Sequence, residues 1–270
     1  MKESVFNNFK DLIAKESGIA LTSEKKALLT TRIGKRLRKL GLNDAEEYLN
    51  IIQTDRSGAE LERLIDAIST NVTHFFREIS HFHFLENLLS EWRMQGKRKA
   101  RVWCAASSTG EEPYSIAMTA AEVLDLNSFN FKLLASDICI DVLQKASLGV
   151  YETSRLKDVP QQMKSAYFSV HSNSHGEKLY KVKPHIRNLV TFKRINLSSF
   201  PLPLSGPIDV IFCRNVMIYF KLDLRAKLIN EYYRLLTPGG YLVVGHSENL
   251  LGIQHEFISL KNTVYQKKSL

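Results

Sequence analysis

The stretch from Arg101 to Met118, RVWCAASSTGEEPYSIAM, most constrains the fold of this chain. Its residues 102–106 form a short apolar run, which is typical of a strand buried on both faces. Small residues follow at 107–110, where the backbone can approach a ligand closely. Pro113 suits a first helical turn, and the apolar residues after it recur with helical spacing. The stretch predicts a strand, a tight loop and a helix, the place where doubly wound α/β proteins hold nucleotide-like cofactors.

The charge of this loop argues against a phosphate ligand. The chain has neither G-x-G-x-x-G nor G-x-x-x-x-G-K-[ST] at this point. The adjacent acids Glu111 and Glu112 would repel a pyrophosphate, but they tolerate a ligand with hydroxyls and a positive charge, such as S-adenosylmethionine. An ordinary loop with two solvated acids explains the stretch equally well, so the loop alone decides nothing.

Composition sets broad limits. The 270 residues are 44% hydrophobic, enough for one or two domains, and the net charge of +9 indicates an acidic partner: nucleic acid, a membrane face or an acidic protein. No apolar run approaches the ~20 residues of a membrane span, and residues 1–10 lack a signal-peptide core, so we expect a cytoplasmic protein without membrane insertion. The three cysteines are typical of buried thiols, and no histidine pattern indicates a metal site. Nothing in the sequence indicates obligate assembly, so we expect a monomer.

The chain divides by its patterning. Residues 1–70 predict an all-helical domain, in which Ser57 and Glu60 fit a capping box before a helix. Residues 71–98 read as a linker and a helix. From 99 to 270 strands alternate with helices, which predicts a mostly parallel sheet with helices on both faces. The predicted strands are 101–106, 131–138, 188–196, 208–213, 241–245 and 263–268. Two short alternating runs at about 166–190 predict a small antiparallel β insert.

Polar side chains follow two predicted strands, at the sheet edge where open α/β proteins bind ligands. Asp137 ends the strand KLLASD; it is placed to accept hydrogen bonds from ribose hydroxyls, or it caps the next helix. Arg214 and Asn215 end the strand IDVIFC. Tyr219 would share a helical face with Asn215, although a half-buried aromatic is the simpler interpretation.

A third segment, TNVTHFFRE at 70–78, joins the helical part to the sheet part. Asn71, Thr73 and Arg77 are its polar residues around two phenylalanines. Taken alone, the segment is also consistent with a capped linker helix whose aromatic residues enter the core.

Together these segments resemble the CheR-type chemoreceptor glutamate methyltransferases. The matching motifs are TNVTHFFRE, CAASSTGEEPYSIAM, ASDI, FCRNVMIYF and TPGGYLVVGHSE, in this order over about residues 60–250. Several long motifs in the correct order are far more specific than any one of them. The resemblance implies a Rossmann-like S-adenosylmethionine-dependent methyltransferase sheet with a small antiparallel β insert, preceded by an all-α N-terminal domain.

The resemblance also implies an activity: methyl transfer from S-adenosylmethionine to glutamate γ-carboxylates of methyl-accepting chemoreceptors, leaving S-adenosylhomocysteine. It places Arg77 and Tyr219 nearest the transferred methyl. The cofactor-binding residues that it implies are Asn71, Thr73, Arg77, Glu112, Asp137, Asn196, Leu197, Arg214 and Asn215.

Such a reaction needs little acid–base chemistry. A glutamate with a pKa near ~4.3 is already ionised at neutral pH, so no general base is required. Catalysis then consists of alignment, with the reacting atoms ~3–3.5 Å apart. We expect Arg77 to orient the carboxylate by a forked hydrogen bond and Tyr219 to assist as a neutral donor.

The expected partner surface lies between Glu24 and Asp44, where no acid interrupts seven basic residues. These are Lys25, Lys26, Arg32, Lys35, Arg36, Arg38 and Lys39. Arg32, Lys35, Arg36 and Lys39 share one helix face, which is usually only solvated; the lack of acids favours docking. The resemblance points to the glutamate-rich cytoplasmic helices of chemoreceptors, and in some relatives the β insert binds a receptor tail peptide. Charge reversal at Arg36 and Lys39 is expected to weaken docking.

Two other functions remain open at this stage. The basic charge favours a nucleic-acid methyltransferase, but the [DNS]PP[YFW] segment usual in amine-methylating members is replaced by CRNVMIYF. A receptor-binding adaptor that has lost turnover is the non-catalytic alternative; the intact motifs argue against it.

Overall fold

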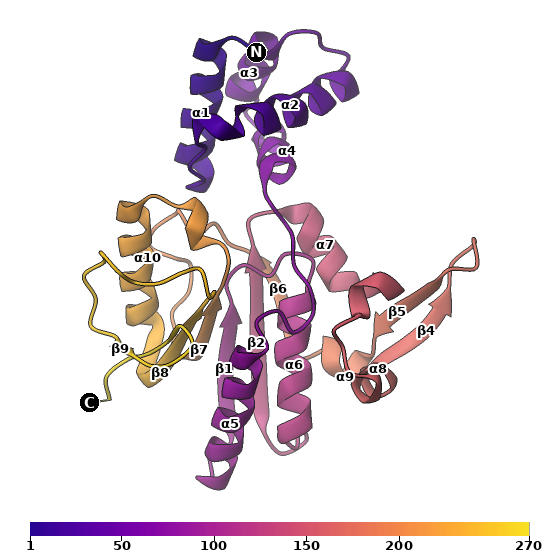
Figure 1. Cartoon of the computed structure of the whole chain (residues 1–270), viewed down its shortest axis with the longest axis vertical. Coiled ribbons are helices and arrows are strands. Elements are labelled where there is room, and N and C mark those ends of the chain that lie inside the picture. The colour runs from indigo at the N-terminus through magenta and orange to yellow at the C-terminus, as the bar shows by residue number, and fades with distance from the viewer. Residues whose placement is uncertain (270) are drawn as a thin grey trace.

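The computed structural model describes residues 1–269 and shows a helical head above an α/β body (Figure 1). The head contains four helices and a short 3₁₀ turn. They are α1 (Glu3–Ser17), η1 (Ser23–Lys25), α2 (Lys26–Leu40), α3 (Ala45–Thr54) and α4 (Ala59–Ile68). Its core contains fully buried Phe9, Ile13, Tyr48 and Leu64. The apolar stripes predicted from the sequence therefore face one another, and burial of these side chains holds the head together.

The capping box expected at Ser57 and Glu60 is wrong. Gly58 is the N-cap of α4, and the backbone N–H of Glu60 donates to the Asp55 carboxylate at 2.9 Å. The Glu60 carboxylate instead accepts two hydrogen bonds from Arg36, at 2.6 and 2.7 Å, and one from Tyr48. The Glu60 side chain, which a capping box would have bonded to the start of α4, instead forms an ion pair with Arg36 on α2.

The body is built on a seven-stranded sheet in the order β6-β2-β1-β7-β8-β10-β9. The first five strands are parallel to their neighbours, and β10 is antiparallel to both β8 and β9. The bounds are β1 (Lys99–Cys104), β2 (Asn130–Asp137), β6 (Val190–Arg194), β7 (Ile208–Cys213), β8 (Leu236–Val244), β9 (Ile258–Ser259) and β10 (Val264–Gln266). The Rossmann-like architecture expected from the sequence is confirmed, and the short edge strand β9 is the one that the sequence did not indicate.

Helices cover both faces of this sheet, as parallel strands require. The helices of the body are α5 (Ser80–Met94), α6 (Glu111–Val123), α7 (Ile140–Leu148) and α10 (Leu222–Leu235). One apolar core lies between the sheet and α5 and α6, and a second lies under α10. The carboxyl edge of the sheet, where β1, β2, β6 and β7 end, faces the helical head (Figure 1).

A small antiparallel sheet projects from the body beside α6 (Figure 1). Its order is β3-β5-β4. The expected hairpin is present as β4 (Phe168–Ser172) and β5 (Lys178–Val182); β3 (Val150–Glu152) adds a strand that the sequence pattern did not indicate. Two short helical pieces, η2 (Thr153–Leu156) and α8 (Gln161–Tyr167), lie between β3 and β4, and α9 (Pro184–Arg187) lies between β5 and β6 of the main sheet.

Backbone and side-chain contacts fix the head on the sheet edge. Ile19 forms an isolated antiparallel bridge with Phe220, and the N–H of Ala20 donates to the carbonyl of Tyr219 at 2.8 Å. The Asn196 side chain donates to the carbonyl of Glu16 at 2.7 Å. These bonds join the end of α1 to the loops that follow β6 and β7. Among residues 1–269, no helix combines the length and apolar character that crossing a membrane requires.

Candidate active site at the carboxyl edge of the sheet

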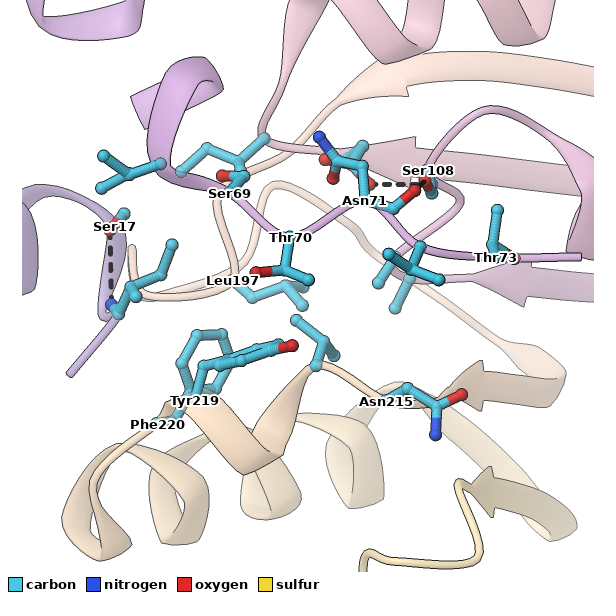
Figure 2. Close-up of a pocket in the computed structure, with 18 of the residues that line it drawn as sticks. Ser17, Ser69, Thr70, Asn71, Thr73, Ser108, Leu197, Asn215, Tyr219 and Phe220 are labelled. Atoms are coloured by element: carbon cyan, nitrogen blue, oxygen red, sulfur yellow. Dashed lines mark hydrogen bonds between the residues drawn. The ribbon is translucent and has the colours of Figure 1, made fainter. Parts of the chain in front are cut away.

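A cavity of about 1010 Å³, counting its open mouth, lies between the head, the linker after α4 and the carboxyl edge of the sheet. Figure 2 shows Thr70 and Asn71 of the linker on one side of this space and Tyr219 and Phe220 on the other. All ten residues singled out from the sequence line the cavity: Asn71, Thr73, Arg77, Glu112, Asp137, Asn196, Leu197, Arg214, Asn215 and Tyr219. The structure thus brings them together, while their individual roles stay predictions.

The loop after β1 needs its small residues for geometric reasons. Gly110 has φ 98°, and a Cβ at this position would lie 2.7 Å from the Tyr151 hydroxyl and 2.9 Å from Ala146. Ser108 is in the left-handed region at φ 46°, and its N–H donates to the Asp137 carboxylate at 2.9 Å. The loop therefore packs closely against α7 and is hydrogen-bonded to Asp137, the acid that ends β2.

Asp137 is buried at the inner end of the cavity. One carboxylate oxygen accepts from the N–H of Ser108 and the other accepts from the N–H of Cys139 at 3.0 Å, ahead of α7. Each oxygen has a second lone pair, so the group can still accept hydrogen bonds from ligand hydroxyls. Burial raises the pKa of Asp137, and the backbone N–H donors oppose that rise.

Glu112 and Arg214 form a buried ion pair rather than two free ligand groups. Arg214 donates to Glu112 at 2.7 Å and to Glu78 at 3.0 Å, and it also donates to the carbonyl of Arg77. Burial raises the pKa of Glu112, and the Arg214 guanidinium opposes that rise. Burial also disfavours ionised Glu78, but Arg214 and Asn215 outweigh it and lower the Glu78 pKa. This network connects β7, α6 and the linker.

Strained backbone is concentrated around the cavity. Phe76, Glu78, Ser108 and Asn215 all have positive φ, between 46° and 57°. Such conformations are unfavourable for residues with a Cβ and persist only where surrounding contacts hold them. The linker residue Phe76 is held by an N–H bond to the Ser115 hydroxyl at 3.0 Å.

Arg77 and Tyr219 are half-buried at the cavity. One guanidinium nitrogen of Arg77 donates to the carbonyl of Val72 at 3.1 Å, and its other donors have no protein partner within residues 1–269. Tyr219 lies on the 3₁₀ turn η3 (Met217–Tyr219), with its hydroxyl directed into the space (Figure 2). The Lys25 ammonium of the head lies 4.7 Å from the Tyr219 ring centroid.

Sequence reasoning missed several contributors. Ser17, Ile19, Leu21, Lys25 and Leu28 line the cavity from the head. No motif marks these residues, because their position depends on how the head docks. Glu78 and Glu248 accept hydrogen bonds from Arg214 and Asn215 in the loop after β7. Both acids lie in the matching motifs, in FFRE and GHSE, so the motifs could have indicated them.

The expected docking face on α2 needs a correction at Arg36. Its side chain is only 11% exposed because it pairs with Glu60. Arg32, Lys35 and Lys39 remain exposed on the same helix. A charge reversal at Arg36 would therefore disrupt the head rather than test docking.

Glu78, His81 and His246 also come together, with ligand atoms within 4.8 Å of one another. Glu78 already pairs with Arg214, and a ring nitrogen of His81 lies 2.7 Å from the Asn262 carbonyl. Burial lowers the pKa of His81 to about 4, with Arg214 adding to the effect. The expected absence of a metal stays a prediction.

Comparison with known proteins assigns the chain to a family. Residues 71–266 match the family described as CheR methyltransferase, SAM binding domain, and residues 4–69 match CheR methyltransferase, all-alpha domain.

Among curated proteins, the chain is 39% identical over 265 residues to the chemotaxis protein methyltransferase of Salmonella typhimurium, covering 98% of this chain and 90% of that protein. It is also 39% identical to the chemotaxis protein methyltransferase of Borreliella burgdorferi, covering 92% of this chain and 86% of that one.

Among solved structures, magnesium protoporphyrin IX methyltransferase from Synechocystis with bound SAH is 15% identical, with a TM-score of 0.33 over 74% of this chain and 71% of that one. That likeness is too distant to inform function. The family matches and the near full-length relatives show that this chain belongs to the CheR methyltransferase family, with an all-α N-terminal domain and an S-adenosylmethionine-binding methyltransferase domain.

Proposed function

We propose that this methyltransferase transfers a methyl group from S-adenosylmethionine to glutamate γ-carboxylates of methyl-accepting chemoreceptors, in the cytoplasm and as a monomer. The relatives' name, chemotaxis protein methyltransferase, supports a role in chemotaxis. One observation carries the proposal: one cavity is lined both by the strand ends that suit this cofactor and by Arg77, Tyr219 and Lys25 of the head.

The residues of the cavity fit S-adenosylmethionine chemically. Asp137 offers lone pairs to ribose hydroxyls, and the apolar side chains of Ile138, Ile195 and Leu197 offer a surface for adenine. The Asn196 side chain is occupied by Glu16 and Ser198, so its contribution to binding would come from the backbone. When bound, the cofactor supplies an electrophilic methyl group on a positively charged sulfur.

Arg77 and Tyr219 then orient the acceptor. The guanidinium donors of Arg77 that are not bonded to Val72 are available to a carboxylate. The Tyr219 hydroxyl is a neutral donor, so it holds an oxygen in line without neutralising the nucleophile. An ionised glutamate needs no base, so positioning supplies the rate enhancement.

The basic face of α2 and the β insert are the proposed contacts with the receptor. Arg32, Lys35 and Lys39 are exposed on the head, which also contributes Lys25 to the cavity wall. Strand β4 pairs only with β5 among the described residues, and Val170 on it is 56% exposed. Its open edge suits a receptor tail peptide added as a further strand.

The decisive test incubates the purified chain with methyl-labelled S-adenosylmethionine and membranes that contain chemoreceptors. We expect label on the receptor that mild alkali releases, because methyl esters hydrolyse and N-methyl groups persist. Tyr219→Phe should bind the cofactor normally with a lower but measurable kcat, and Arg77→Ala should bind the cofactor more weakly and lower kcat further. Label on RNA or DNA instead, or cofactor binding without transfer, would overturn the proposal.

A further inference from the structure

The carboxylate of Glu248, in the segment GHSE after β8, has an unusual set of partners. It is 2% exposed and accepts four backbone N–H groups. One oxygen accepts from Asn215 at 2.6 Å and Gly245 at 2.8 Å; the other accepts from Val216 at 3.0 Å and Met217 at 2.8 Å. Four N–H donors on one buried carboxylate make charge-assisted bonds that are stronger than neutral ones.

Three of these donors belong to the turn that ends in Tyr219. Asn215 has φ 57°, in the left-handed region that asparagine tolerates better than most residues with a Cβ. Val216 is the N-cap of η3 but makes no side-chain cap, and η3 presents Tyr219 to the cavity. Free N–H groups at the start of a helical turn need an acceptor, and Glu248 supplies it from the loop after β8.

Gly245 shows how closely the two loops approach. A Cβ at this position would lie 2.5 Å from the Asn215 side-chain nitrogen and 2.8 Å from the Glu248 carboxylate. Gly245 is not in the left-handed region, so an alanine fits its backbone conformation, and the three atoms nearest to its Cβ would all belong to Asn215 and Glu248. The chain therefore offers a way to disturb the contact without removing the charge.

We propose that Glu248 is a positioning residue for methyl transfer, which acts by holding residues 215–217 so that the Tyr219 hydroxyl meets the acceptor carboxylate. The role rests on the proposed function, because it acts through Tyr219. Asn215 is held from its other side by Glu78, which accepts from the Asn215 side chain at 3.2 Å. Glu248 differs in that it holds the backbone leading to Tyr219.

The test is a double-mutant cycle with Glu248→Gln and Tyr219→Phe, with kcat measured at saturating cofactor and receptor. The glutamine amide places donors against backbone N–H groups, so we expect kcat to fall about 20-fold in the wild-type background. In the Tyr219→Phe background Glu248→Gln should lower kcat less than about threefold, because the hydroxyl that Glu248 positions is then absent. A merely structural loss would lower kcat by the same factor in both backgrounds and would overturn the role.

A second readout does not depend on turnover. In protein carrying 3-fluorotyrosine, the ¹⁹F resonance of Tyr219, assigned by its loss in Tyr219→Phe, should shift or broaden in Glu248→Gln. Gly245→Ala should reproduce both effects and serves as the test if Glu248→Gln does not fold. The matched control is Glu231→Gln, whose carboxylate accepts the N–H of Leu202 at 3.2 Å away from the cavity.

The outcomes separate the two proposals. A wild-type chain that transfers no methyl to receptors refutes the proposed function, and the fluorine spectra still test positioning. An unchanged Tyr219 resonance in both Glu248→Gln and Gly245→Ala refutes positioning even if the wild-type enzyme is active.

Discussion

The two walls of the cavity are built in opposite ways. The sheet wall presents buried charges whose partners are already in place: Asp137 accepts backbone N–H groups, and Glu112 and Arg214 pair with each other. The wall formed by the head and linker presents half-exposed or exposed side chains with few partners, among them half-exposed Lys25 and Arg77 and exposed Val72. The difference supports the proposal that the preorganised wall holds most of the cofactor and that the other wall adapts to a macromolecular acceptor.

The largest expected effect is the loss of stability when Glu112, on the sheet wall, is replaced. Glu112→Ala leaves one end of buried Arg214 without its partner, so we expect the free energy of unfolding to fall by about 3 kcal/mol. Val72→Ala on the opposite wall, where the side chain is 75% exposed, should change it by less than about 0.5 kcal/mol. Urea denaturation of the two variants measures both values. Equal values would remove the contrast between the walls.

The next effect is the pH dependence of the free energy of unfolding that His81 causes. Its pKa of about 4 in the folded chain lies below the ~6.5 of an unfolded histidine, so the unfolded state binds more protons between these values. Its stabilising contribution is complete above pH ~6.5 and is lost as pH falls towards 4, by at most about 3 kcal/mol. Unfolding free energies of the wild type and His81→Gln should therefore converge as pH falls. A constant difference would contradict this prediction.

A smaller effect sharpens the role of Asp137. Asp137→Asn keeps the size of the side chain but weakens its charge-assisted hydrogen bonds, so we expect cofactor affinity to fall about 10- to 100-fold. Thr70→Ala, on the linker wall, should change cofactor affinity less than about threefold. Calorimetric titration with S-adenosylhomocysteine measures both constants. If Thr70→Ala had the larger effect, the cofactor would lie against the other wall.

The smallest effect concerns the exposed basic face of the head. Reversal of both Lys35 and Lys39 to glutamate should raise the KM for receptor about five- to tenfold and leave cofactor affinity unchanged, because both side chains are exposed. The increase should shrink with added salt. Arg36→Glu should instead lower the melting temperature, because Arg36 pairs with Glu60. A KM that does not respond to Lys35 and Lys39 would place docking elsewhere.

The sequence by itself determined the architecture and the membership of the site. Apolar runs and turn residues located six of the seven strands of the main sheet, because strands buried on both faces need continuous apolar sequence. The ordered motifs contain eight of the ten residues singled out from the sequence, and all ten line one cavity. The strand-end residues meet there because the carboxyl ends of parallel strands lie at one edge.

Only the tertiary structure decided which charges are available to a ligand. Glu112 and Asp137 look alike in the sequence, yet Arg214 pairs with the first, while the second accepts the backbone N–H groups of Ser108 and Cys139. Arg36 and Lys35 are neighbours in a basic run, yet within residues 1–269 Arg36 pairs with Glu60 on another helix while Lys35 stays exposed. The physical reason is that the availability of a charge depends on groups distant in the chain, and local pattern does not encode how the head packs on the sheet.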